Sequence, residues 1–300
     1  MTIHNNALIA LTAAASWGGG DFSGGMGVKA SGGGVYRAVR LVLLAHAISL
    51  AALAEILWTR HAALPHGIAV GWAIAAGVTG ALGVVAFYTA LSRGAMGASA
   101  AVSGLLAAAI PALVSSMMEG APAGMRLAGF ALAGGAIWLI AAGESPENEH
   151  AASRREARGT MALAIVGGTA FGVYFVALKM ANPLGLVMPM AIARASSVML
   201  CLGALGVMKL VGRGSRRPAR ETRWQAGWRW ALGVAVLDTG GNILFMAATR
   251  LGRLDVASVL ASLYPAGTIL LAAWYLHERP TRRQMMGMAA ALAAVVMITL

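Results

Sequence analysis

The residues best placed to do chemistry are Asp238 and Asn242, which interrupt an otherwise apolar segment between residues 228 and 250. They stand four residues apart, so on a helix both side chains project from one face. A carboxylate inside an apolar helix of membrane length costs about 2.5–3.5 kcal/mol to insert, and such residues mark binding or transport sites. Asp238 could bind a substrate amine or exchange a proton. A structural hydrogen bond to a neighbouring helix explains it equally well.

Three more charged residues lie within apolar segments, namely Asp21, Arg40 and Arg194. The two arginines could hold a substrate carboxylate through paired N–H groups. They could instead extend along their apolar stems to the membrane surface. Asp21 stands among glycines and could be a cavity carboxylate, an interfacial group or the ion-pair partner of an arginine.

Aromatic residues make up only 6% of the chain, and a few of them fall inside apolar segments. Such a side chain can line a pocket with its ring and donate a hydrogen bond from its polar end. Plain packing is the alternative. The predicted substrate-binding set is Trp17, Asp21, Arg40, Tyr88, Tyr174, Arg194, Asp238, Asn242 and Tyr264.

Two prolines, Pro111 and Pro265, also fall inside apolar segments. Proline removes a backbone hydrogen bond and favours a kink. We expect these two positions to act as hinges, with a static kink as the alternative.

The composition indicates which elements position these residues. Of the 300 residues 59% are hydrophobic and 11% are charged, whereas a soluble domain carries about 25% charged residues. A soluble fold would expose too much apolar surface, so the chain is predicted to be an all-α membrane protein. The net charge of +12 fits basic loops on one side of a membrane better than nucleic-acid binding.

Ten segments reach the roughly 20 apolar residues that a membrane helix requires. They are 7–28, 34–58, 68–91, 97–117, 124–142, 160–181, 186–210, 228–250, 255–275 and 282–300. A polar stretch at 143–159 divides them into five and five, which predicts a first repeat at 1–142, a linker at 143–159 and a second repeat at 160–300.

The two halves resemble each other. The segment beginning Phe87 matches the segment beginning Phe245, and Arg40 matches Arg194, at shifts of 158 and 154 residues. Each half also carries a GxxxG pair in its first helix, Gly20/Gly24 and Gly168/Gly172, a pattern that permits close helix contact. Because five is odd, the second half would enter the membrane from the opposite side, which gives an inverted-topology repeat typical of secondary transporters.

These features resemble the EamA-like branch of the drug/metabolite transporter superfamily. The resemblance rests on the opening Trp17–Phe22, on the paired arginines and on a proline followed by a glutamate and a glycine-bearing last helix, as in 263–287 and more weakly 111–129. It implies ten helices, export of small metabolites or amino acids, and either ion coupling or facilitated diffusion. The first half departs from the pattern at Met117–Glu119, where the second half has Leu276–Glu278.

Alternate connections fall on opposite sides, and sixteen of the 23 lysines and arginines fall on one of them. By the positive-inside rule that side is cytoplasmic, with both termini outside, whereas the resemblance places the termini inside. The predicted location is a bacterial inner membrane, with the lipid bilayer and a small-molecule substrate as partners.

The predicted function is a secondary transporter, not an enzyme, that exports aromatic or hydrophobic amino acids by alternating access through a cavity between the repeats. A multidrug or cationic-compound exporter is the alternative, and a membrane enzyme or scramblase is a more distant one. No cofactor is expected, since no phosphate-binding loop occurs, and no metal, since the six histidines lack ligand spacing. The sequence does not decide whether transport is coupled to protons, or whether the protein is a monomer or a homodimer.

Overall fold

The computed structural model describes residues 2–93, 96–141, 151–211, 227–275, 277 and 281–299. Every regular element within these residues is a helix, and none of them forms a strand. The elements are α1 (Thr2–Ala30), α2 (Val35–Thr59), α3 (Ile68–Leu91), α4 (Met96–Glu119), α5 (Gly124–Ala141), α6 (Ala151–Ala181), the short 3-10 helix η2 (Asn182–Leu184), α7 (Val187–Leu210), α8 (Trp228–Leu251), α9 (Leu254–Ala261), α10 (Tyr264–Tyr275) and α11 (Arg282–Thr299).

The all-helical membrane class is confirmed. Among the described residues, seven helical segments are long and apolar enough to cross a membrane, with α9 and α10 together forming one of them. The remaining predicted spans coincide with α1, α5 and α11. The many exposed leucines, methionines and tryptophans on the helices are the surface that a lipid environment would cover.

Two boundaries differ from the sequence-based expectation. The segment 255–275 is broken at Ser262 and Leu263, so Pro265 is the second residue of α10 and not a kink inside one helix. Proline fits there because the first turn of a helix needs no N–H donor. The linker expected at 143–159 is helical from Ala151 onward, where α6 begins, and its residues 143–150 lie outside the described residues. Pro111 does lie inside a helix, α4.

The GxxxG glycines lie at close helix contacts, as predicted. A side chain at Gly24 would meet the ring of Tyr88 on α3 at 2.2 Å, and one at Gly168 would meet the backbone of Ser103 on α4 at 2.7 Å. The Ser103 hydroxyl donates across the second contact to the carbonyl of Ala164 at 2.8 Å. These contacts allow α1 and α6 to run deep inside the bundle.

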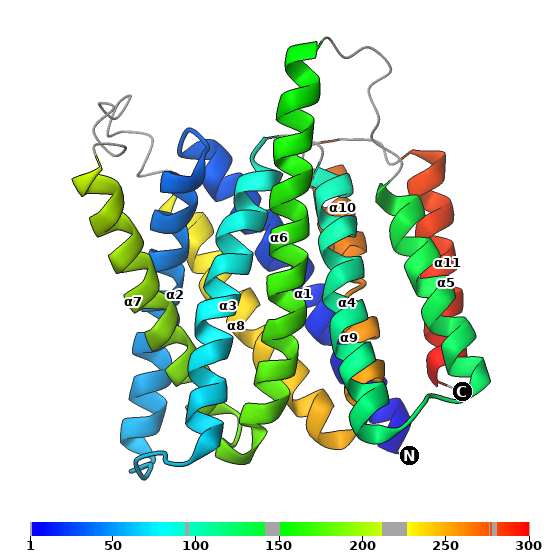
Figure 1. The fold of residues 1–300 in the computed structure, drawn as a ribbon, viewed down its shortest axis with the longest axis horizontal. Helices are drawn as coiled ribbons and strands as arrows, with labels where there is room; N and C mark the ends of the chain where they lie inside the picture. The colour runs from blue at the N-terminus through cyan, green and yellow to red at the C-terminus, as the bar shows by residue number, and fades with distance from the viewer. Residues whose placement is uncertain are drawn as a thin grey trace.

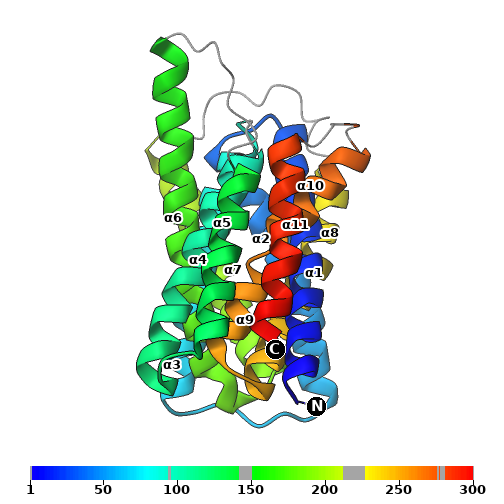
Figure 2. The same ribbon diagram turned by 90° about the vertical axis from the view of Figure 1, so that its right-hand side faces the viewer.

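The helix pairs follow a regular scheme (Figure 1). Helix α1 packs on α8 and α10, while α6 packs on α3 and α4. Helix α2 packs on α7 at one edge of the bundle, and α5 packs on α11 at the other edge. Figure 2 shows α5 and α11 side by side, in front of the rest of the bundle. The centre is therefore bounded by α1, α3, α6, α7, α8 and α10.

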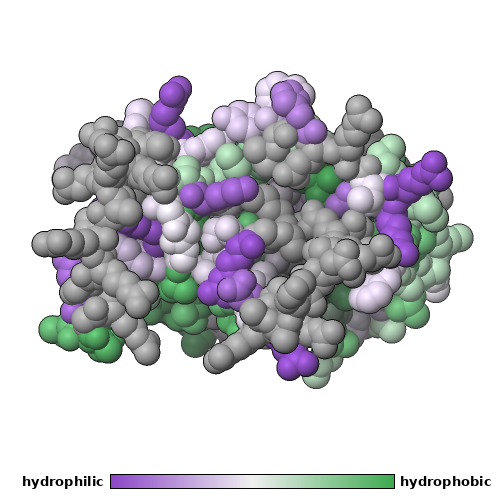
Figure 3. All heavy atoms as spheres, turned by 90° about the horizontal axis from the view of Figure 1, so that it is seen from above, coloured by the Kyte–Doolittle hydropathy of each residue, from purple (hydrophilic) through white to green (hydrophobic). Residues whose placement is uncertain are grey.

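Both termini lie at one end of the bundle, and α6 begins at the opposite end (Figures 1 and 2). Figure 3 views that opposite end from above and shows hydrophilic side chains spread across it, with hydrophobic side chains along its edges. Helices α1 and α6 enter the bundle from opposite ends and run in opposite directions.

Candidate functional site

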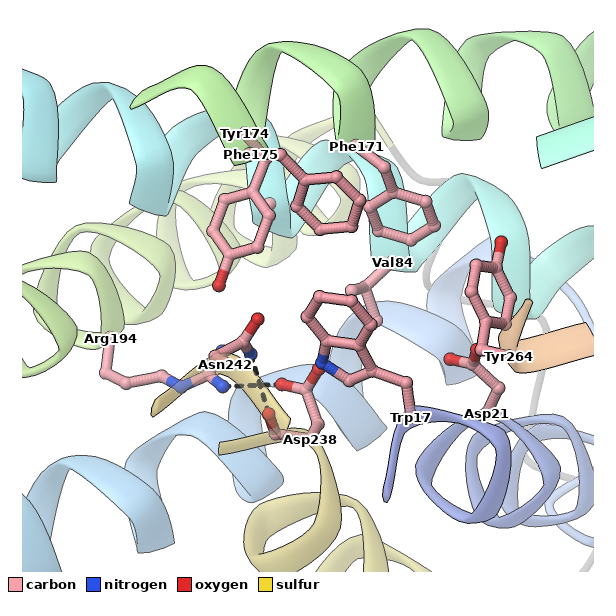
Figure 4. Close-up of a pocket in the computed structure, with 11 residues that line it drawn as sticks. Trp17, Asp21, Val84, Phe171, Tyr174, Phe175, Arg194, Asp238, Asn242 and Tyr264 are labelled. Atoms are coloured by element: carbon pink, nitrogen blue, oxygen red, sulfur yellow. Dashed lines mark hydrogen bonds and ion pairs between the residues drawn. The ribbon is translucent and has the colours of Figure 1, made fainter. Parts of the chain in front are cut away.

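A cavity with about 410 Å³ of empty space lies between the central helices (Figure 4). The lining residues come from α1, α3, α6, α7, α8 and α10. They are Trp17, Asp21, Gly80, Val84, Phe171, Tyr174, Phe175, Arg194, Asp238, Asn242 and Tyr264.

An ion pair between α7 and α8 forms one wall of the cavity. Arg194 Nη2 donates to Asp238 Oδ2 at 2.5 Å, and the two side chains are only 5% and 13% exposed. Asn242, one turn after Asp238, donates from its side-chain nitrogen to the Asp238 carbonyl at 2.7 Å. Its side-chain oxygen is buried with no partner among the described residues, so an acceptor is left for a ligand.

Asp21 supplies a second carboxylate to the cavity from α1 and is only 9% exposed. It interacts electrostatically with Tyr88 on α3. Within the described part of the chain, no lysine or arginine forms an ion pair with it. Because Arg194 already balances Asp238, ionised Asp21 gives the cavity a net charge of −1.

Aromatic rings form the other wall (Figure 4). Trp17 stacks on Phe175 with ring centroids 4.9 Å apart and planes 10° apart. Phe245 packs against both rings from behind, at 5.6 and 4.7 Å. The hydroxyl of Tyr264 is buried with no partner among the described residues. The cavity thus combines flat apolar surface with the carboxylate of Asp21, for which the described residues provide no cation.

Seven of the nine predicted site residues line this cavity, and two do not. Tyr88 is fully buried behind the cavity, where its hydroxyl donates to the carbonyl of Gly20 at 3.4 Å. Arg40 lies beside Tyr36 on its own helix, with its guanidinium 5.8 Å from that ring. Arg40 and Arg194 match in sequence, but only Arg194 reaches the cavity, so the two halves are not equivalent there.

Several residues that the structure brings to the site were not selected from the sequence. Phe171, Phe175 and Val84 line the cavity, but each looked like an ordinary apolar residue of a membrane helix. His46 lies directly behind the ion pair, with Nε2 2.8 Å from Arg194 Nη1. Its position inside an apolar segment was the available signal. Among the described residues no group of three histidine, cysteine, aspartate or glutamate side chains could hold a metal ion.

The comparison with protein families gives a match to the second half of the chain. Residues 158–300 match the family described as the EamA-like transporter family. We call residues 158–300, which are similar to this family of membrane transporters, the EamA-like region. The EamA-like region supplies seven of the eleven lining residues, including Arg194 and Asp238, while Trp17, Asp21, Gly80 and Val84 come from the first half.

The fold of the whole chain also has a known counterpart. One solved crystal structure of a protein resembles it with a TM-score of 0.70 at 18% identity, covering 98% of each chain. At that identity the likeness concerns the fold alone. It extends the resemblance beyond the EamA-like region to the first half. No curated protein matches the chain by sequence.

Proposed function

We propose that the protein is a secondary transporter that binds its substrate in the central cavity and exports it by alternating access. The observation that carries this proposal is the cavity itself. It lies between the EamA-like region and the first half, and it combines an aromatic wall with a carboxylate that has no cation partner among the described residues. A bacterial inner membrane is the location that goes with this function.

The helix pairing supports an inverted repeat. If α1 to α5 correspond to α6, α7, α8, the pair α9/α10 and α11, then exchanging the halves converts the α1–α8 contact into the α6–α3 contact. The same exchange converts α1–α10 into α6–α4 and leaves α2–α7 and α5–α11 unchanged. In transporters with such a pseudo-two-fold arrangement, the substrate site lies between the repeats.

The groups at the cavity fit a hydrophobic or aromatic amino acid. The substrate ammonium would pair with Asp21, and its apolar side chain would lie against Trp17 and Phe175. Its carboxylate would accept a hydrogen bond from the Tyr264 hydroxyl, which is buried without a partner among the described residues.

Cationic apolar compounds are the second candidate class, and a specific observation favours them. Three charges line the cavity, and Arg194 and Asp238 neutralise each other at 2.5 Å, which leaves the charge of Asp21. A monocation with an aromatic body would neutralise this carboxylate and stack on Trp17, with cation–π attraction adding about 0.5–2 kcal/mol.

Alternating access also requires contacts that close one end of the cavity and can break. A group of polar contacts between the two halves lies at the end of the bundle that holds the termini. Glu119 of the first half lies 3.9 Å from both Lys179 Nζ and Arg253 Nε. Arg253 also donates to the carbonyl of Gly120 at 2.8 Å and pairs with Asp255 at 2.8 Å. The hydrogen bond to Asp255 is the main cause of the raised pKa of Arg253, so this closure keeps its charge.

A counter-flow assay in proteoliposomes tests the proposal. Wild-type protein, Asp21→Asn and the control Glu55→Gln, which changes an exposed carboxylate on α2, are each given phenylalanine, leucine and organic cations. We expect Asp21→Asn to abolish flux and Glu55→Gln to preserve it. Flux of amino acids alone supports the first class, and flux of cations alone supports the second. If wild-type protein moves none of them, or if Asp21→Asn transports as well as wild type, the proposal is wrong.

A further inference from the structure

A buried histidine on α2 holds the central ion pair from outside the cavity. His46 is 1% exposed. Its Nδ1 lies 2.5 Å from the Ser197 hydroxyl on α7, and its Nε2 lies 2.8 Å from Arg194 Nη1. The same Nε2 lies 3.8 Å from Asp238 Oδ2. Both ring nitrogens therefore have partners, and one of those partners, Arg194, also lines the cavity.

These partners determine the protonation state of the ring. An arginine guanidinium carries only donors, so Nε2 must be the acceptor and carries no proton. Nδ1 then carries the single proton of the neutral ring and donates to Ser197. In this arrangement His46 is a neutral acceptor for a charged donor.

His46 is one of three acceptors that fix the guanidinium of Arg194. Nη1 is held by His46, while Nη2 donates to Asp238 and to the Thr239 hydroxyl at 3.1 Å. Thr239 donates in turn to Ser49 on α2 at 2.9 Å. The network joins α2, α7 and α8, and it leaves Nε as the Arg194 nitrogen without a partner among the described residues.

A proton on Nε2 would reverse this arrangement. The ring would then present a donor to the donor Nη1 and bring two cations together at 2.8 Å, a repulsive contact in a site of low dielectric. The new N–H could turn to Asp238 Oδ2, only 3.8 Å away, and compete with Arg194 for it. Protonation of one side chain would thus loosen the α7–α8 ion pair.

Building on the proposed transport function, we propose that His46 is a positioning residue. In its neutral form it holds Arg194 on Asp238, and its protonation releases that pair and slows transport. His46 does not line the cavity, so it acts on the substrate only through Arg194 and Asp238.

Other titratable groups near the network could also change the pH dependence of transport, and their effect has to be distinguished from that of His46. Arg194 on α7 and Asp238 on α8 contact it directly. Cys201 on α7 is in hydrogen-bonding contact with Ser197, the second partner of His46. Asp21 on α1, Tyr88 on α3 and Tyr174 on α6 interact electrostatically with the ion pair. All of these groups remain in a variant that changes His46 alone.

The test compares His46→Gln with His46→Ala and with the control His66→Gln, which alters an exposed histidine. Glutamine offers an oxygen acceptor to Arg194 but takes up no proton. Counter-flow is measured from about pH 8 down to about pH 4, with equal pH on both sides, because the repulsion from Arg194 has to be overcome before the buried ring takes up a second proton.

We expect wild type and His66→Gln to lose transport on acidification. His46→Gln should keep its rate at pH 8 and lose that acid decline, while His46→Ala should fall at least about fivefold at every pH, since it leaves a buried donor unsatisfied. A wild-type acid decline that persists in His46→Gln would overturn the proposal. Absence of any flux in wild type would count against the transport function instead.

Nitrogen-15 NMR of histidine-labelled wild type gives a second readout, which holds even if a variant fails to fold or if no flux is found. We expect the buried histidine to carry its proton on Nδ1 at neutral pH and to gain the Nε2 proton on acidification. A proton on Nε2 at neutral pH would refute the assignment.

Discussion

Removing the charge of Asp238 should destabilise the protein more than its small change in shape suggests. Asp238→Asn keeps the size of the side chain but leaves Arg194, with a side chain only 5% exposed, without its anion at 2.5 Å. Breaking a buried ion pair by removing one partner costs about 3–5 kcal/mol. At about 2–4 °C per kcal/mol for chains of 150–250 residues, the melting temperature should fall by at least about 6 °C.

A double variant separates stability from function. Arg194→Met combined with Asp238→Leu removes both charges and fills the space with apolar groups, a replacement that is often neutral or stabilising. We expect the double variant to melt near the wild-type temperature, well above Asp238→Asn, and to transport nothing. The exposed Glu55→Gln should match wild type in both measurements.

The assays are thermal unfolding in one detergent and counter-flow in proteoliposomes, both at neutral pH. Two results would refute the reasoning. One is an Asp238→Asn protein as stable as wild type, which would mean that the pair is not buried as an ion pair. The other is a double variant that still transports, which would mean that the pair contributes only to stability.

Two further substitutions test the packing and the aromatic wall. Gly24→Ala should cost about 1–3 kcal/mol of stability through overpacking, because the added carbon would lie 2.2 Å from the Tyr88 ring. The control Gly71→Ala has nothing within 4 Å of the added carbon and should be neutral or slightly stabilising in thermal unfolding. Equal melting temperatures for the two would contradict the close contact. Trp17→Ala should raise the half-saturation concentration of an aromatic substrate about two- to tenfold through lost stacking. The control Trp58→Ala, at a residue that is 79% exposed, should leave that concentration unchanged. Equal effects of the two substitutions would argue against the aromatic wall.

The sequence could predict those parts of the fold that depend on apolar length and on isolated polar residues. The helices follow from long apolar segments, and Asp238 stood out because a carboxylate is costly among them. The same argument selected Asp21 and Arg194, and all three line the cavity. Composition alone was informative here because so few of the residues are charged.

The features that were missed depend on contacts between distant segments. His46 and Ser197 are 151 residues apart and meet only through the packing of α2 on α7. The break at Ser262 and Leu263 was hidden in an apolar run, where Pro265 suggested a kink but not the end of a helix. Arg40 was selected by its match to Arg194, yet the internal similarity of the halves does not make their side chains equivalent in the cavity.

The balance of charges around the cavity has an electrical consequence. With His46 neutral and Arg194 offset by Asp238, an ionised Asp21 would be the one uncompensated charge among the described residues that line the empty cavity. A membrane potential acts on that charge with about 2.3 kcal/mol per 100 mV across the full field, and it holds the empty site toward the positive side. A zwitterionic substrate leaves this charge in place, whereas a monocation cancels it. Current recorded from protein-loaded membranes would therefore tell the two substrate classes apart without any labelled compound.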